Sequence, residues 1–155
     1  QLRPGGEDRV GMGERDAAIE KMKQVIGMDP DNADALNYLG YTYAEQGVKL
    51  DEAESLIRRA LEMEPDSGYI LDSMGWVYYR RGDYEKARTY LEKAISKVTD
   101  DPVILEHLGD VYVKLNLSDK ALEYYRRARQ LTDKAKDKAS LADKIKALED
   151  SGVKP

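Results

Sequence analysis

The sequence predicts an all-α fold of antiparallel helix pairs stacked into a solenoid, and two observations support this prediction. First, Gly40, Gly75 and Gly109 recur at intervals of 35 and 34 residues, each in a stretch whose apolar residues have helical spacing. Repetition at this interval is typical of stacked supersecondary units. Second, Leu, Ala, Glu, Lys and Tyr dominate the composition, whereas the runs of Val, Ile and Thr that favour strands are missing.

The N-terminal segment precedes the first complete repeat. Residues 1–13 are rich in glycine and lack periodicity, so we expect a flexible linker or a remnant of the expression sequence. Residues 14–30 have apolar residues at helical spacing, with Ala18 and Pro30 in register with the later repeats. We therefore predict that 14–30 is the second helix of a truncated repeat.

Three complete repeats fill residues 33–133, and each is predicted to contain two helices. The first helix surrounds the glycine and ends at a residue type that tolerates the left-handed conformation: Gly47, Gly82 or Asn116. The second helix carries alanines at matching positions, and we expect it to start at a favourable N-cap: Asp51, Asp83 or Ser118. Prolines mark the repeat boundaries at Pro30, Pro65 and Pro102.

The mid-helix glycines need a compensating interaction, because glycine costs a helix about 1 kcal/mol relative to alanine. We expect the two helices of a repeat to cross closely at the glycine, so that buried contact outweighs this cost. Residues 134–150 follow the last repeat with an apolar stripe opposite Lys and Asp. Such a stripe predicts a capping helix with one face on the last repeat and one in water.

The repeat pattern resembles the tetratricopeptide repeat (TPR), whose signature is W-x2-L-G-x2-Y…A-x3-F…P over 34 residues. The Leu-Gly pair is matched at Leu39-Gly40, Met74-Gly75 and Leu108-Gly109, whereas leucine stands in the tryptophan position at Leu36, Leu71 and Leu105. The resemblance implies a right-handed α-solenoid in which the first helices line a concave groove. The segments 35–47 and 70–82 are also similar to the terminal repeats of bacterial multi-TPR proteins, often envelope-associated, which implies a cytoplasmic or periplasmic location.

The groove positions of the family, carried onto this chain, give a candidate partner-binding site. Trp76 and Tyr79 lie three residues apart on one side of a helix, and we expect them to form an aromatic patch with Tyr41. The alternative is that Trp76 packs between repeats. The implied groove residues are Asn37, Tyr38, Tyr41, Tyr69, Asp72, Ser73, Trp76, Tyr79, Arg80, Glu106, His107 and Asp110.

The composition of this groove differs from that of the family members that clamp a chaperone's terminal carboxylate with Lys, Asn and Arg. Asn37 and Arg80 are present, but aromatic and acidic residues occupy the other candidate positions. We therefore do not carry that function over. An aromatic and acidic groove suits an extended or helical peptide with apolar and basic residues.

Several classes of function lack support in the sequence. The chain has no cysteine and one histidine, His107, which we expect to be a satisfied surface or groove residue, and we predict no metal site and no cofactor. No catalytic motif occurs, so an enzyme is not predicted. A net charge of −5 argues against a nucleic-acid partner, and no run of about 18 apolar residues predicts a membrane span.

The sequence thus predicts a non-catalytic scaffold or adaptor that binds a protein partner. The alternative is a structural spacer or self-assembly unit within a longer repeat protein. Ile19, Met22, Val25 and Ile26 would be covered by the next repeat on one side only, and we expect no polar outer face at this end. A homodimer through the N-terminal half repeat is therefore a further prediction.

Overall fold

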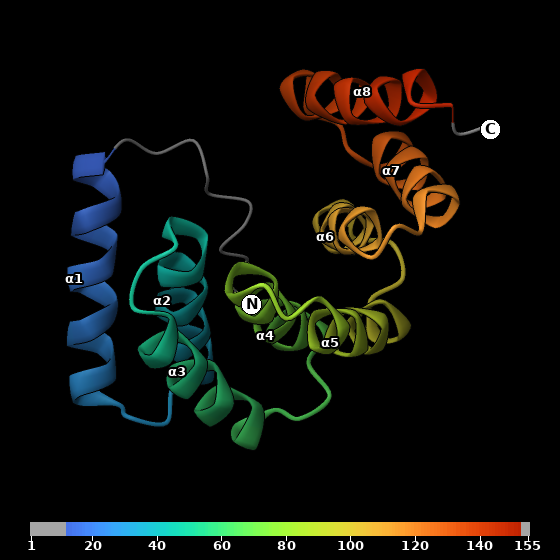
Figure 1. Cartoon of the computed structure of the whole chain (residues 1–155). Coiled ribbons are helices and arrows are strands. Elements are labelled where there is room, and N and C mark those ends of the chain that lie inside the picture. The colour runs from blue at the N-terminus through green and yellow to red at the C-terminus, as the bar shows by residue number, and fades with distance from the viewer. Residues whose placement is uncertain (1–11, 153–155) are drawn as a thin grey trace.

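The computed structural model describes residues 12–152, which form eight helices joined by short turns (Figure 1). Successive helices run antiparallel and stack into a solenoid, and the described part of the chain contains no strand. The predicted all-α solenoid of helix pairs is confirmed. The helices are α1 (Met12–Met28), α2 (Ala33–Gln46), α3 (Leu50–Met63), α4 (Gly68–Arg81), α5 (Tyr84–Lys97), α6 (Pro102–Lys114), α7 (Ser118–Leu131) and α8 (Ala135–Asp150).

The glycines lie where the two helices of each repeat touch. A Cβ atom added to Gly75 on α4 would stand 2.7 Å from Leu91 Cγ on α5 and 3.2 Å from the Ala87 carbonyl oxygen. Gly40 has the same relation to Ile57, at 2.6 Å, and Gly109 to Tyr125, at 2.5 Å. Contacts this short are closer than packed side chains allow, so the predicted close crossing at the glycines is confirmed.

Tyrosine hydroxyls link the second and third repeats to the second helix of the repeat before each of them. Tyr78 on α4 donates to Glu54 on α3 at 3.1 Å, and Tyr112 on α6 donates to Glu92 on α5 at 2.7 Å. Each glutamate also pairs with an arginine one turn away: Glu54 with Arg58, and Glu92 with Arg88. These contacts lie beside the apolar core and give the repeats a fixed register.

The helix ends agree in part with the sequence prediction. Positive φ angles at Gly47, Gly82 and Asn116, of 72°, 83° and 60°, confirm the expected helix stops. Asp83 is the N-cap of α5 and accepts a bond from the Lys86 backbone. The expected caps at Asp51 and Ser118 are wrong, because the carbonyl groups of Lys49 and Leu117 already accept helical bonds from Ala53 and Ala121.

The N-terminal helix starts earlier than predicted, at Met12 rather than residue 14, and the linker prediction for residues 1–11 lies outside the described residues. The expectation that this end lacks a polar outer face is wrong. On α1, Ile19 is buried, Met22 and Ile26 are half-buried against the apolar core, and Val25 is half-buried. The exposed residues of α1 include Glu14, Asp16, Glu20, Lys21, Lys23 and Gln24. Among residues 12–152, no helix is long and apolar enough to cross a bilayer.

Candidate functional site

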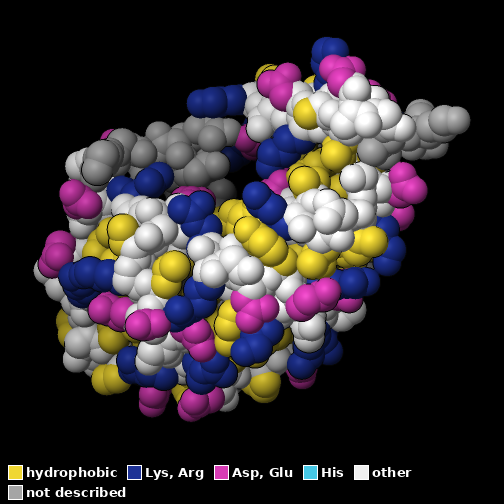
Figure 2. Space-filling view, in the orientation of Figure 1, with side chains coloured by type: hydrophobic (Ala, Val, Ile, Leu, Met, Phe, Trp, Pro, Cys, Tyr) yellow, Lys and Arg dark blue, Asp and Glu magenta, His cyan; other side chains and the backbone are white. Residues whose placement is uncertain are grey.

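A cavity of about 440 Å³ lies on the concave side, between the first helices of the repeats and α8. Figure 2 shows charged side chains of both signs over much of the visible surface, with hydrophobic ones emerging beneath α8. The cavity is lined by Tyr41, Glu45, Trp76, Pro102, Val103, Glu106, His107, Asp110, Thr132, Asp133, Lys134, Asp137, Leu141 and Lys144. It therefore draws on all three repeats and on the capping helix.

Three rings form a continuous stack in the cavity wall. Trp76 on α4 stacks on His107 of α6, with ring centroids 3.9 Å apart, and on Tyr79, with centroids 4.4 Å apart. Two rings this close to the indole centre would overlap if they shared a face, so they lie on opposite faces. Trp76 thus packs between the second and third repeats, which is the alternative weighed for it from sequence, and it also lines the cavity.

A chain of hydrogen bonds crosses the floor of the groove through His107. Its Nδ1–H donates to Asp72 on α4 at 2.8 Å, and its Nε2 lies 3.4 Å from the Tyr41 hydroxyl of α2. Tyr41 in turn donates to Glu45 at 3.2 Å. The Tyr41 hydroxyl has one proton, and it donates that proton to Glu45. The contact with Nε2 is therefore best satisfied when the imidazole is doubly protonated, because Nε2–H can then donate to the tyrosine oxygen.

The electrostatics around His107 favour the same protonation state. Burial by itself would lower the pKa of the imidazole. The charge and hydrogen bond of Asp72, with smaller contributions from Asp110 and Glu106, outweigh burial and raise the pKa of His107 above its ordinary value. His107 is therefore held among carboxylates that favour its charged form. It is hydrogen-bonded, as expected from the sequence, but deeply buried, with only 7% of its surface exposed.

An ion-pair cluster joins α8 to α6 beside the cavity. The Lys144 ammonium of α8 lies 2.6 Å from Glu106 and 2.9 Å from Asp110, both on α6. Asp110 also accepts a bond from the Tyr125 hydroxyl at 2.5 Å, and burial beside Asp110 raises the pKa of that phenol. The two carboxylates outweigh the effect of burial on Lys144 and raise its pKa as well.

Five of the twelve residues implied by the resemblance line this cavity: Tyr41, Trp76, Glu106, His107 and Asp110. Asp72 and Tyr79 stand behind them as partners of His107 and Trp76. Asn37 and Ser73 are each only 1% exposed, which closes them to a partner. The remaining three lie outside the cavity lining: Tyr38 and Tyr69, which are half-buried, and Arg80, which is exposed.

Sequence reasoning missed the contribution of the C-terminal helix to the groove. Asp137, Leu141 and Lys144 line the cavity from α8. Their spacing of four and three residues places them on one helical face, which is the signal that was available. Within residues 12–152 no group of three His, Asp or Glu side chains is arranged to hold a metal ion.

Comparison with known proteins agrees with the repeat frame. Models described as "Tetratricopeptide repeat" match residues 31–98 and 73–136, and one described as "TPR repeat" matches 6–47. The TPR repeat-containing protein PA4667 of Pseudomonas aeruginosa is 40% identical over 76 residues, or 48% of this chain. The chain spans only 13% of that relative's length.

Solved structures share the fold. A thermophilic TPR protein of Thermus thermophilus superposes with a TM-score of 0.73 at 22% identity. The superposition covers 88% of this chain and 74% of the Thermus chain. MamA superposes with a TM-score of 0.63 at 27% identity, over 77% of this chain and 70% of the MamA chain. The first TPR of Spaghetti (RPAP3), bound to the HSP90 peptide SRMEEVD, gives 0.68 at 18% identity, covering 79% and 94%. With its glycine crossings and three matching family models, the chain belongs to the tetratricopeptide repeat family.

Proposed function

We propose that this chain is a non-catalytic interaction module that holds a peptide or helix of a partner protein in its concave groove, as a scaffold or adaptor. The observation that carries the proposal is the cavity shared by α2, α4, α6 and α8. Its wall combines apolar side chains, such as Val103 and Leu141, with the edge of Trp76 and a set of carboxylates. Concave sites with this mixture bury apolar groups and orient polar ones.

The charge of the cavity defines the class of partner segment. Two lysines, Lys134 and Lys144, face a larger set of carboxylates: Glu45, Glu106, Asp110, Asp133 and Asp137. An acidic peptide such as SRMEEVD, which the RPAP3 repeat binds, would meet like charge here. We therefore propose a segment that carries apolar and basic side chains.

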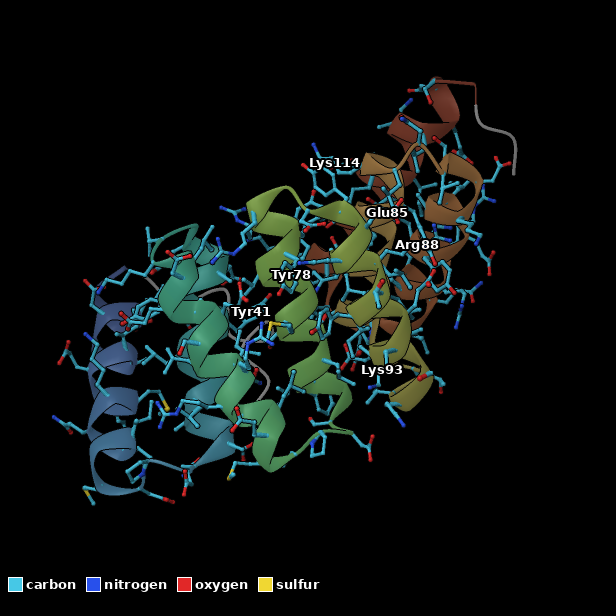
Figure 3. All side chains as sticks on the ribbon, turned by 60° about the horizontal axis from the view of Figure 1, so that its bottom comes forward. Tyr41, Tyr78, Glu85, Arg88, Lys93 and Lys114 are labelled. Atoms are coloured by element: carbon cyan, nitrogen blue, oxygen red, sulfur yellow. The ribbon has the colours of Figure 1, made fainter. Side chains whose placement is uncertain are left out.

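A phage-displayed library of random dodecapeptides tests this function, with binding of selected peptides measured by calorimetry. Val103→Arg places a bulky cation in the cavity wall, whereas Lys93→Glu changes an exposed residue of α5 outside the cavity (Figure 3). We expect Val103→Arg to weaken the selected peptides by about tenfold or more, as expected when a contact at the centre of an interface is lost, and Lys93→Glu to leave them unchanged. A library without cavity-dependent binders would favour a structural spacer instead.

A further inference from the structure

The capping helix places a cation of the chain's own on the cavity wall. Lys144 reaches from α8 to Glu106 and Asp110 of α6, at 2.6 and 2.9 Å. All three residues also line the cavity. The ion pairs are therefore not sealed in the core, and a molecule that enters the cavity meets them directly.

The attachment of α8 does not depend on this lysine. Leu141 and Ile145, which are 1% and 4% exposed, anchor α8 in the apolar core. Arg126 on α7 adds an ion pair to Glu149 at 2.6 Å. The Lys144 side chain is about one-third exposed and flexible, so it can swing into water while the helix stays in place.

The cavity is complementary to a guanidinium once Lys144 has moved. Asp110 keeps its bond from Tyr125, which leaves acceptor capacity on both carboxylates for the planar donors of an arginine. The faces of Trp76 are covered by Tyr79 and His107, so the cation cannot be held by stacking on the indole. Recognition at this point rests on charge and hydrogen bonding.

We propose that Glu106 and Asp110 form the docking point for an arginine side chain of the partner segment, and that Lys144 occupies this point until the arginine displaces it. The inference rests on the proposed function and gives it a chemical selectivity. Lys144 acts as an internal competitor, which lowers the affinity for basic segments and excludes segments that lack a cation. The Lys144 ammonium and the arginine guanidinium of the partner thus compete for the same two carboxylates.

The test uses two synthetic octapeptides of alternating leucine and arginine, or leucine and citrulline, each acetylated and amidated. Citrulline keeps the shape of arginine without its charge. Two variants on α8 are compared by calorimetry: Lys144→Gln and the control Lys146→Gln, whose lysine pairs with Asp150 on the exposed side of α8. Both remove one positive charge, so long-range effects on the arginine peptide are the same.

We expect Lys144→Gln to bind the arginine peptide about tenfold more tightly than the parent, because the arginine then no longer has to displace a charge-assisted contact. Lys146→Gln should bind the arginine peptide with the affinity of the parent. The affinity for the citrulline peptide should be unchanged by either lysine substitution. Glu106→Gln, which keeps the shape of the wall, should weaken the arginine peptide alone.

Three results would overturn the inference: an equal effect of the two lysine variants, equal binding of the two peptides to Lys144→Gln, or no binding of either peptide to parent and variant. The proposed function is judged separately. Library peptides that lose affinity with Val103→Arg but contain no arginine would uphold the groove and reject the docking point. Circular dichroism of each variant verifies that it is folded.

Discussion

At the residue scale, Gly75 marks the point where α4 and α5 come closest. Gly75→Leu should lower the free energy of unfolding by several kcal/mol, about 1–3 kcal/mol for the overpacking alone, because even a Cβ would stand 2.7 Å from Leu91. The control is Gly27→Ala on α1, where an added Cβ has no neighbour within 4 Å. That change should be neutral or slightly stabilising. Thermal melting measures both, and an unchanged melting temperature for Gly75→Leu would contradict the close crossing.

His107 makes stability depend on pH in a defined direction. Its pKa is raised in the folded protein, so protonation stabilises the fold. This contribution is complete below the unfolded pKa of about 6.5 and disappears as pH rises through the higher folded pKa. The groups that act on the ring are Asp72 of α4, Tyr41 of α2, and Glu106 and Asp110 of α6. Glu45 of α2 is bonded to Tyr41.

His107→Gln removes this titration while keeping a donor for Asp72. We expect the stability difference between parent and variant to be largest near pH 6 and to shrink as the solution becomes alkaline. Urea unfolding at a series of pH values measures the difference. A difference that stays constant across the series would show that His107 does not hold an extra proton in the folded state.

At the element scale, Trp76 connects α4 with α6, while Leu71 lies inside the core. Leu71 is 2% exposed, and Leu71→Ala should cost about 2–5 kcal/mol of stability. Trp76 is partly exposed at the cavity, so Trp76→Ala should cost less stability but weaken peptide binding by about 2 kcal/mol or more. Urea unfolding and calorimetry on the same two variants separate the effects. Equal destabilisation by both would make the tryptophan a core residue alone.

The helices and their order could be predicted because their signals are local. The repeated glycine, the stops at Gly47 and Gly82 and the apolar spacing all act within one helix pair. The start of α3 was missed because an extra residue in its turn puts Lys49 at φ 50°, a conformation that lysine rarely adopts. The preference for Asp at an N-cap predicted that the helix begins at Asp51, whereas the turn places the N-cap at Lys49.

The candidate site could be predicted only in part, because its contacts join distant positions. The family resemblance placed Trp76 and His107 on the concave side, but not in one stack. No pattern in the sequence connects Lys144 with Glu106, 38 residues earlier, since that contact depends on how α8 is docked. Side-chain contacts between elements need the tertiary structure.

At the scale of the whole molecule, self-association through α1 stays a prediction. The half-buried Met22, Val25 and Ile26 leave apolar area that a second copy would cover. We expect the sedimentation coefficient to rise with protein concentration, and Met22→Glu to abolish the rise. Met63→Glu, at the exposed end of α3, is the control and should leave the rise unchanged. A 17.5 kDa monomer at every concentration would contradict the prediction.

The tyrosine–glutamate contacts between repeats bear on how such a chain changes during evolution. Glutamate and arginine exchange places between α3 and α5: Glu54 and Arg88 hold equivalent positions, as do Arg58 and Glu92. In both orders the following tyrosine still donates to the glutamate. At these two junctions the contact thus needs one such pair, in either orientation. We expect duplication or loss of a whole repeat to preserve these junctions, so that the array can lengthen or shorten without a new interface.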